Sequence, residues 1–242
     1  MKRAVIAFLS LFVVILASAC GGGGGGGTTG GGGTGGGSGG GTTGTTLETF
    51  LYVGNRGANP QGSITVFEMF TGGALTKVGI PKSTGLTPTG IAASADGNYL
   101  YVSRITPTEI SQYQINPGGT LTELSTPVFP MPGAAWSIFA HPTKMAVYVP
   151  DSTNNRIYQF AIDASGQLQP MAPAFLVTGS EPKYGTFHPF GDVLYLTCRD
   201  GGIVNQFVVN ADGSLSPHAT PSVAAGLGAS GITMTQNGLY AY

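Results

Sequence analysis

A strand-like motif recurs along this chain at a nearly constant interval. Each copy pairs an aliphatic residue with a tyrosine, and the tyrosines stand at positions 52, 101, 148, 195 and 240. A second apolar motif follows each of the first four copies at the same interval: Ile64–Phe67, Ile110–Tyr113, Ile157–Phe160 and Val204–Phe207. Repeats of about 40 to 50 residues that are built from short strands are typical of β-propeller blades.

Turn signals separate four strand segments within each repeat. A Gly-x-Leu motif precedes the last strand of each complete repeat, with its glycine at positions 73, 119, 166 and 213. Residues 47–242 show no sustained helical periodicity, so the apolar faces of the repeats must pack on one another. We therefore predict an all-β propeller of four-stranded antiparallel blades, with about four blades and part of a fifth present.

The two ends of the repeat region are incomplete as blades. The first repeat lacks an inner strand, and the sequence stops at Tyr242, inside a fifth tyrosine strand. Half a hairpin leaves backbone groups unpaired. We therefore expect the sequence to be truncated at its C-terminus and the blades that are present to form an open arc rather than a closed ring.

The first 46 residues differ in composition from the repeats. A basic start, an apolar run to Leu16 and the small residues before Cys20 indicate a signal peptide over residues 1–19, too short to span a membrane. Ala-Ser-Ala-Cys resembles the bacterial lipoprotein cleavage box, which implies lipid attachment at Cys20 and a place at the outer membrane or cell surface. The alternative is ordinary secretion. Residues 21–46 contain only Gly, Thr and Ser, which predicts a flexible linker from the anchor to a propeller over residues 47–242.

The charge and cysteine content exclude several classes of function. The chain has a net charge of −1 and no basic patch, which argues against nucleic acid as a partner. If Cys20 is processed, Cys198 is the only cysteine left for the propeller, so we expect no intrachain disulfide. His141 and His188 occupy one repeat position before a proline, which favours a turn role over a metal or catalytic one. We expect no metal and no cofactor.

The repeats resemble the Tyr-Val-Thr-Asn repeat of the lactonase-type seven-bladed β-propellers, which include 6-phosphogluconolactonase-like and muconate-cycloisomerase-like proteins. Four segments carry the resemblance: Tyr52–Asn55, Tyr101–Arg104, Tyr148–Asp151 and Tyr195–Cys198. The resemblance implies an incomplete seven-bladed ring. It also implies either a lactonase or cycloisomerase, or a surface protein without enzymatic activity.

The resemblance directs attention to one blade. Lactonases of the family usually carry Pro-Arg-His before an inner strand and a Glu after the tyrosine strand of the same blade. The matching triplet here is Pro182-Lys183-Tyr184, and Arg199 stands at the Glu position. General acid–base opening of a lactone needs a group that titrates near neutral pH, usually His or a carboxylate. Lys183, Tyr184 and Arg199 are therefore only weak catalytic candidates.

The same residues are candidates for ligand binding. Blade alignment predicts that Lys183, Tyr184 and Arg199 converge with Trp136 toward one opening, where Trp136 starts an inner strand; core packing is the alternative for this tryptophan. We expect five charged residues that follow tyrosine strands to lie in loops near one face, where an exposed rim is the favoured interpretation: Arg56, Arg104, Asp151, Arg199 and Asp200. The sequence favours a propeller that binds a ligand or protein at the cell envelope. The alternative is a hydrolase that opens a lactone or sugar-acid lactone, with a small anionic sugar acid or lactone as its ligand.

Overall fold

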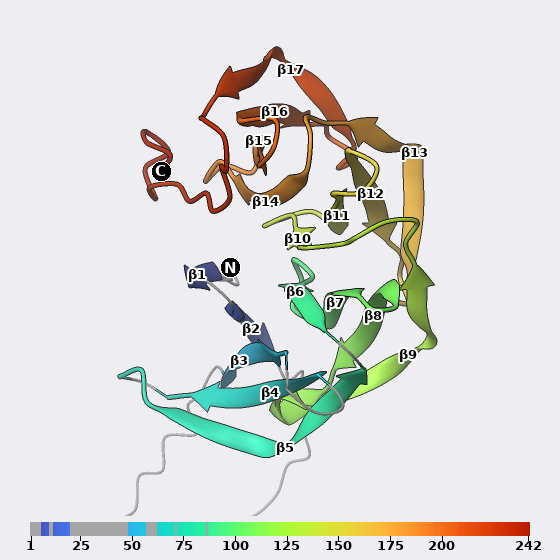
Figure 1. Cartoon of the computed structure of the whole chain (residues 1–242). Helices are drawn as coiled ribbons and strands as arrows, with labels where there is room; N and C mark the ends of the chain where they lie inside the picture. Colours follow the sequence, from blue (N-terminus) through green and yellow to red (C-terminus); the bar gives the residue numbers. More distant parts are fainter. Residues whose placement is uncertain (1–5, 10–11, 20–47, 57–61, 71, 86) are drawn as a thin grey trace, which may run out of the picture.

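The computed structural model describes residues 6–9, 12–19, 48–56, 62–70, 72–85 and 87–242. Within these ranges the only helical element is the 3-10 turn Pro117–Gly119, and the all-β prediction is confirmed. Four antiparallel sheets follow one another along the chain and form an open arc (Figure 1). No helix in the described part of the chain has the length and apolarity needed to cross a bilayer.

The strands of each sheet follow sequence order from the inside of the arc to its rim. The first sheet holds β1 (Ile6–Leu9), β2 (Phe12–Ala19), β3 (Glu48–Asn55), β4 (Gly62–Met69) and β5 (Leu75–Gly85). The second holds β6 (Pro88–Ala93), β7 (Tyr99–Ile105), β8 (Thr108–Ile115) and β9 (Leu121–Pro130). The third holds β10 (Phe139–Ala140), β11 (Ala146–Asp151), β12 (Arg156–Ile162) and β13 (Leu168–Val177). The fourth holds β14 (Pro182–Phe187), β15 (Val193–Cys198), β16 (Ile203–Val209) and β17 (Leu215–Ala224).

The first sheet differs from the prediction at its inner edge. The first repeat was expected to lack an inner strand, but β2 pairs antiparallel with β3 in the register Val14 to Val53 through Ala19 to Glu48. The apolar segment that predicts a signal peptide therefore fills this place. The prediction of a lipidated Cys20 and of a Gly, Thr and Ser linker falls on residues 20–46, outside the described residues.

Three of the repeated tyrosines hold neighbouring blades together. Tyr52, Tyr101 and Tyr148 are completely buried, and the hydroxyl of each donates to the carbonyl of the Gly-x-Leu glycine in the next blade. The three bonds measure 2.9 Å for Tyr52 to Gly119, 2.7 Å for Tyr101 to Gly166 and 2.5 Å for Tyr148 to Gly213. The tyrosine and glycine repeats share one period because they form the two halves of one contact between blades.

Two glutamines repeat a second contact between blades. The Leu168 backbone N–H donates to Gln112 Oε1 at 2.9 Å, and the Leu215 backbone N–H donates to Gln159 Oε1 at 2.6 Å. Each glutamine also donates its Nε2 hydrogen to the outer strand of its own blade, at Thr126 and Pro173. Buried polar groups are satisfied in this way, so the blades pack at one fixed register.

His141 is a turn residue of the third blade. Its Nδ1 accepts hydrogen bonds from the backbone N–H groups of Thr143 (3.1 Å) and Lys144 (3.0 Å). The proton therefore lies on Nε2, which donates to the Gly191 carbonyl of the fourth blade at 2.7 Å. Burial lowers the pKa of this imidazole. His188, 47 residues later, lies 3.0 Å from the Asp192 carboxylate through its Nδ1.

His141 is expected to make the fold sensitive to acid. Because its pKa is lower in the folded state, the unfolded chain binds the proton first as the pH falls below about 6.5, the usual histidine value. Stability is then lost progressively below this pH. We expect His141→Asn to lose less stability than the wild type between pH 7 and pH 5, by about 1 kcal/mol for each unit by which the histidine pKa is lowered. The measurement is the free energy of unfolding in urea at the two pH values. His218→Asn, on the outer strand β17, is the control. An unchanged pH slope in His141→Asn would contradict the assignment.

Candidate functional site

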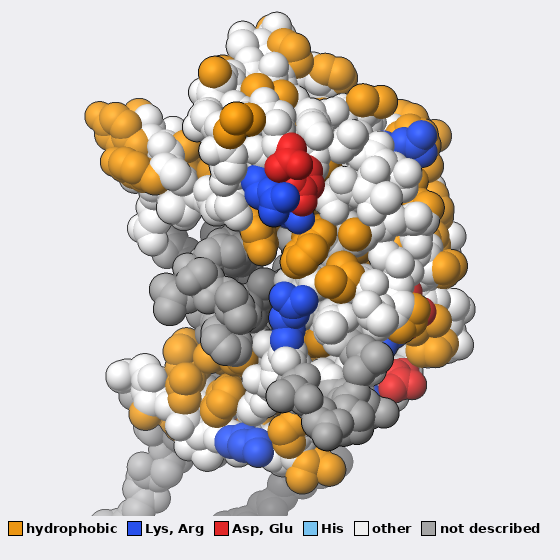
Figure 2. Space-filling view, viewed as in Figure 1, with side chains coloured by type: hydrophobic (Ala, Val, Ile, Leu, Met, Phe, Trp, Pro, Cys, Tyr) orange, Lys and Arg blue, Asp and Glu red, His pale blue; other side chains and the backbone are white. Residues whose placement is uncertain are grey.

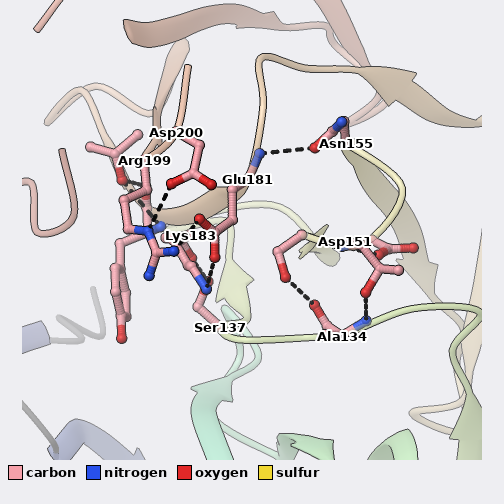
Figure 3. Close-up of polar contacts among 12 residues, drawn as sticks. Ala134, Ser137, Asp151, Asn155, Glu181, Lys183, Arg199 and Asp200 are labelled. Atoms are coloured by element: carbon pink, nitrogen blue, oxygen red, sulfur yellow. Dashed lines mark hydrogen bonds and ion pairs between the residues drawn. The ribbon is translucent and has the colours of Figure 1, made fainter. Parts of the chain in front are cut away.

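A cluster of ionic side chains lies where the third and fourth blades meet, on the face of the arc that carries the connections into the inner strands. Glu181 and Lys183 come from the start of β14, and Arg199 and Asp200 from the turn after β15 (Figure 3). Acidic and basic side chains adjoin on this face (Figure 2). Lys183 and Trp136 are 47 residues apart and so occupy the same place in adjacent blades.

Glu181 is the centre of the cluster. Its Oε1 lies 2.8 Å from Lys183 Nζ, and its Oε2 lies 2.6 Å from Arg199 Nη2. Arg199 Nε also contacts Asp200 Oδ1 at 3.1 Å, a hydrogen bond that raises the pKa of Arg199. Only 7% of the Lys183 side chain is exposed, against 46% for Arg199. A buried ammonium needs an anionic partner, and Glu181 supplies it.

Trp136 supplies the apolar side of the cluster. The Lys183 ammonium lies 3.9 Å from the centre of its ring, within the range of a cation–π interaction. The Arg56 guanidinium, which has the same repeat position in the first blade as Arg199 in the fourth, lies 5.8 Å from the same ring. The Ser137 hydroxyl donates to the Lys183 carbonyl and joins the two blades at this point.

The backbone of Glu181 has an uncommon conformation. Its φ is 56°, in the left-handed region, where a residue with a side chain is disfavoured by about 1–2 kcal/mol. The equivalent residues Thr87 (φ 51°) and Gly228 (φ 84°) share this conformation, whereas Ala134 in the third blade does not. The Glu181 N–H donates to Asn155 Oδ1 at 2.8 Å, and its carbonyl accepts from the Arg199 N–H at 2.9 Å. A glutamate occupies a position where glycine would fit without strain, which points to a use for its side chain.

The structure brings together three of the four predicted site residues. Lys183, Arg199 and Trp136 form one network through Glu181 and the cation–π contact. Trp136 does not start a strand, however, because β10 begins only at Phe139. Tyr184 is held through its backbone instead: its N–H donates to Thr197 Oγ1 at 3.3 Å, and its carbonyl accepts from the same hydroxyl at 2.9 Å.

Two residues expected in exposed rim loops are buried at strand ends. Arg104 is the next-to-last residue of β7, and its guanidinium donates hydrogen bonds to the Thr84 carbonyl and the Glu109 carboxylate. Asp151 ends β11 and accepts from the backbone N–H groups of Thr153 (3.0 Å) and Asn154 (3.1 Å). Asp151 is bonded within its own loop, whereas Arg104 joins Glu109 of its own blade to Thr84 of the first blade.

Glu181 was missed by sequence reasoning. The acid was sought after the tyrosine strand, where Arg199 stands, and the structure shows an acid in the preceding connection instead. Glu181 can be recognised as a site residue only when the position two before Lys183 is considered together with Arg199. The two side chains meet because the backbone bends at Glu181, where φ lies in the left-handed region.

The remaining chemistry of the described residues is limited. Cys198 is buried, and burial raises the pKa of its thiol to about 11, so it is a poor nucleophile near neutral pH. No group of three or more potential metal ligands occurs within the part of the chain that the structure describes. The Glu181 cluster therefore offers an acid–base carboxylate, two cationic hydrogen-bond donors and an aromatic surface.

Comparisons with known proteins agree with this fold. The family described as "Lactonase, 7-bladed beta-propeller" matches residues 43–139 and 134–242. Among solved structures, the periplasmic gluconolactonase PpgL of Pseudomonas aeruginosa has 21% identity and a TM-score of 0.62, with 79% of this chain and 60% of that chain covered. A 6-phosphogluconolactonase candidate from Bacteroides uniformis has 18% identity and a TM-score of 0.65, with 80% and 60% covered.

Both likenesses show the fold, and this chain spans about 60% of the length of either structure. No curated protein matches the chain. The family match extends over nearly all of the repeat region and includes the Glu181 cluster. The chain belongs to the lactonase family of seven-bladed β-propellers.

Proposed function

We propose that this propeller hydrolyses a sugar lactone at the Glu181 cluster. The observation that carries the proposal is the Glu181 carboxylate, held between Lys183 and Arg199 next to the Trp136 ring. Further support comes from the gluconolactonase among the structures of similar fold. Lactone opening needs a proton acceptor for water and donors for the oxygen that becomes negative, and the cluster contains both.

The proposed reaction proceeds in two steps. The Glu181 carboxylate accepts a proton from water while the water oxygen bonds to the lactone carbonyl carbon, and the carbonyl electron pair moves onto its oxygen. Lys183 and Arg199 donate hydrogen bonds to this oxyanion. When the carbonyl re-forms, the ring C–O bond breaks, and the proton returns from Glu181 to the leaving alkoxide oxygen. The product is an open hydroxy acid, and Trp136 packs against the sugar ring throughout.

Acid release from a panel of aldonolactones tests the proposal. We expect the wild-type protein to release acid faster than the spontaneous rate. Lys183→Ala and Arg199→Ala should each lower kcat by about 100-fold, the low end of what loss of one oxyanion donor costs. Lys77→Ala, an exposed cation on the rim strand β5, is the control and should match the wild type. Absence of turnover on the whole panel would exclude the hydrolase, and turnover unaffected by either substitution would exclude this site.

The second candidate is a propeller that binds a ligand or an envelope protein without turnover. It is supported by the triplet before β14, in which Lys183 and Tyr184 stand in place of the Arg-His pair. It is also supported by the ion pairs that Lys183 and Arg199 already form with Glu181. Titration calorimetry with aldonolactones and their open acids separates the two proposals. Binding of a lactone that is recovered unchanged would favour the binding module.

We further propose that the protein is exported and anchored by a lipid on Cys20. The support is the charged start, the apolar run and the Ala-Ser-Ala-Cys sequence. Intact-mass measurement of the protein purified from its envelope fraction tests the anchor. A mass that begins at residue 20 and includes acyl chains is expected, and a mass without acyl chains would exclude lipidation.

A further inference from the structure

We infer that Asn155 of the third blade is a positioning residue for the Glu181 carboxylate of the fourth. This inference rests on the proposed hydrolase function, and it adds a residue that acts through Glu181 rather than on the substrate. The observation that carries it is the hydrogen bond of 2.8 Å that the Glu181 backbone N–H donates to Asn155 Oδ1, which crosses between the two blades (Figure 3).

This bond joins two residues that share an uncommon backbone conformation. Among the described residues, three that are not glycine have a φ in the left-handed region: Thr87, Asn155 and Glu181. The last two are in direct contact. Gly202 follows Asn155 by 47 residues, so it has the equivalent place in the fourth blade, and its φ is 60°. Glycine thus satisfies this turn, and an asparagine in its place points to a use for its side chain.

The loop that carries Asn155 is fixed on the third blade. Asp151 is completely buried, and its Oδ1 accepts hydrogen bonds from the backbone N–H groups of Thr153 and Asn154. The Ala134 N–H donates to Thr153 Oγ1 at 3.1 Å and braces the loop from the preceding connection (Figure 3). A buried carboxylate whose hydrogen bonds are satisfied holds its loop in one conformation. The Asn155 amide therefore has a fixed place that does not depend on Glu181.

Asn155 binds the connection into β14 at two points. Its carbonyl accepts from the Thr178 N–H at 2.9 Å, and its side chain accepts from the Glu181 N–H three residues later. The two bonds hold both ends of the bend that directs the Glu181 side chain toward Lys183 and Arg199. Because a displacement of about 1 Å in a catalytic group costs up to about 10²-fold in rate, loss of the side-chain bond should weaken catalysis.

Steady-state kinetics of Asn155→Gly and Asn155→Asp with one aldonolactone test the inference. Glycine keeps the left-handed backbone but removes the acceptor, so kcat should fall by about 10- to 100-fold, with KM and the urea midpoint close to those of the wild type. Aspartate keeps an acceptor in the same place, so its kcat should stay within about threefold of the wild type. Asn116→Gly is the control, because the Asn116 amide bonds to Thr120 and Thr122 of its own turn in the second blade. Its kcat should match the wild type.

The fluorescence of Trp136 tests the same contact without turnover. Trp136 is the only tryptophan in the chain, and its ring lies 3.9 Å from the Lys183 ammonium that Glu181 holds. Displacement of Glu181 should therefore change the surroundings of this ring. We expect the emission spectrum to change in Asn155→Gly and to return to the wild-type spectrum in Asn155→Asp. Asn116→Gly should leave it unchanged.

The outcomes separate the inference from the proposed function. If the wild type opens the lactone, a wild-type kcat in Asn155→Gly, or a loss that Asn155→Asp does not restore, would overturn the inference and leave the hydrolase standing. If the wild type opens no lactone, the proposed function fails and the fluorescence decides the inference. An emission spectrum of Asn155→Gly identical to that of the wild type would then overturn it.

Discussion

Replacing Glu181 with glutamine is expected to lower kcat/KM for lactone hydrolysis by about 10²- to 10⁴-fold, the usual contribution of a general acid–base group. Glutamine keeps the shape of the side chain but cannot accept the proton from water. The measurement is kcat/KM for one aldonolactone with both proteins at the same pH.

The matched control is Asp200→Asn, which removes the other carboxylate on Arg199. It should keep a much higher kcat/KM than Glu181→Gln, because Asp200 holds a cation and transfers no proton in the proposed reaction. Glu181→Gln also leaves the buried Lys183 ammonium without its anionic partner, which costs stability. Circular dichroism of each variant therefore has to show that the blades are intact. A kcat/KM of Glu181→Gln as high as that of Asp200→Asn would assign the proton transfer to another group.

Most of the fold could be predicted from the sequence because the same strand and turn motifs build each blade. The segments around Tyr101, Tyr148 and Tyr195 lie in β7, β11 and β15, and the second apolar motifs lie in β4, β8, β12 and β16. The tyrosine and glycine repeats show one period, but the hydroxyl-to-carbonyl bond that joins them crosses between blades. Only the radial packing of the sheets reveals that the two motifs touch.

The site was only partly predictable, for a reason that also lies in the backbone. Blade alignment placed Trp136, Lys183 and Arg199 together because they have fixed positions in neighbouring repeats. The contribution of Glu181 depends on a left-handed φ, which no side-chain pattern shows for a glutamate. The inner strand β2 was missed because an apolar run is equally compatible with a signal peptide and with a buried strand.

The contact between blades should make Gly166→Ala strongly destabilising. Gly166 has a φ of 83°, and a Cβ built on it would overlap the ring of Tyr99 in the preceding blade. Alanine therefore adds steric overlap of about 1–3 kcal/mol to a backbone cost of about 1–2 kcal/mol. We expect a loss of about 2–5 kcal/mol in the free energy of unfolding, measured by urea titration, which is a large part of the stability of a typical domain.

Gly73→Ala isolates the part of this loss that comes from blade packing. Gly73 has the same place in the first blade and a φ of 84°, but among the described residues no atom lies within 4 Å of a Cβ built on it. Its substitution should therefore cost only the backbone term of about 1–2 kcal/mol. Equal losses at the two glycines would mean that the turn conformation alone explains the Gly-x-Leu repeat. A larger loss at Gly166 would show that the glycine is required because a neighbouring blade lies against it, which is the contact that makes a chain of separate sheets cooperative.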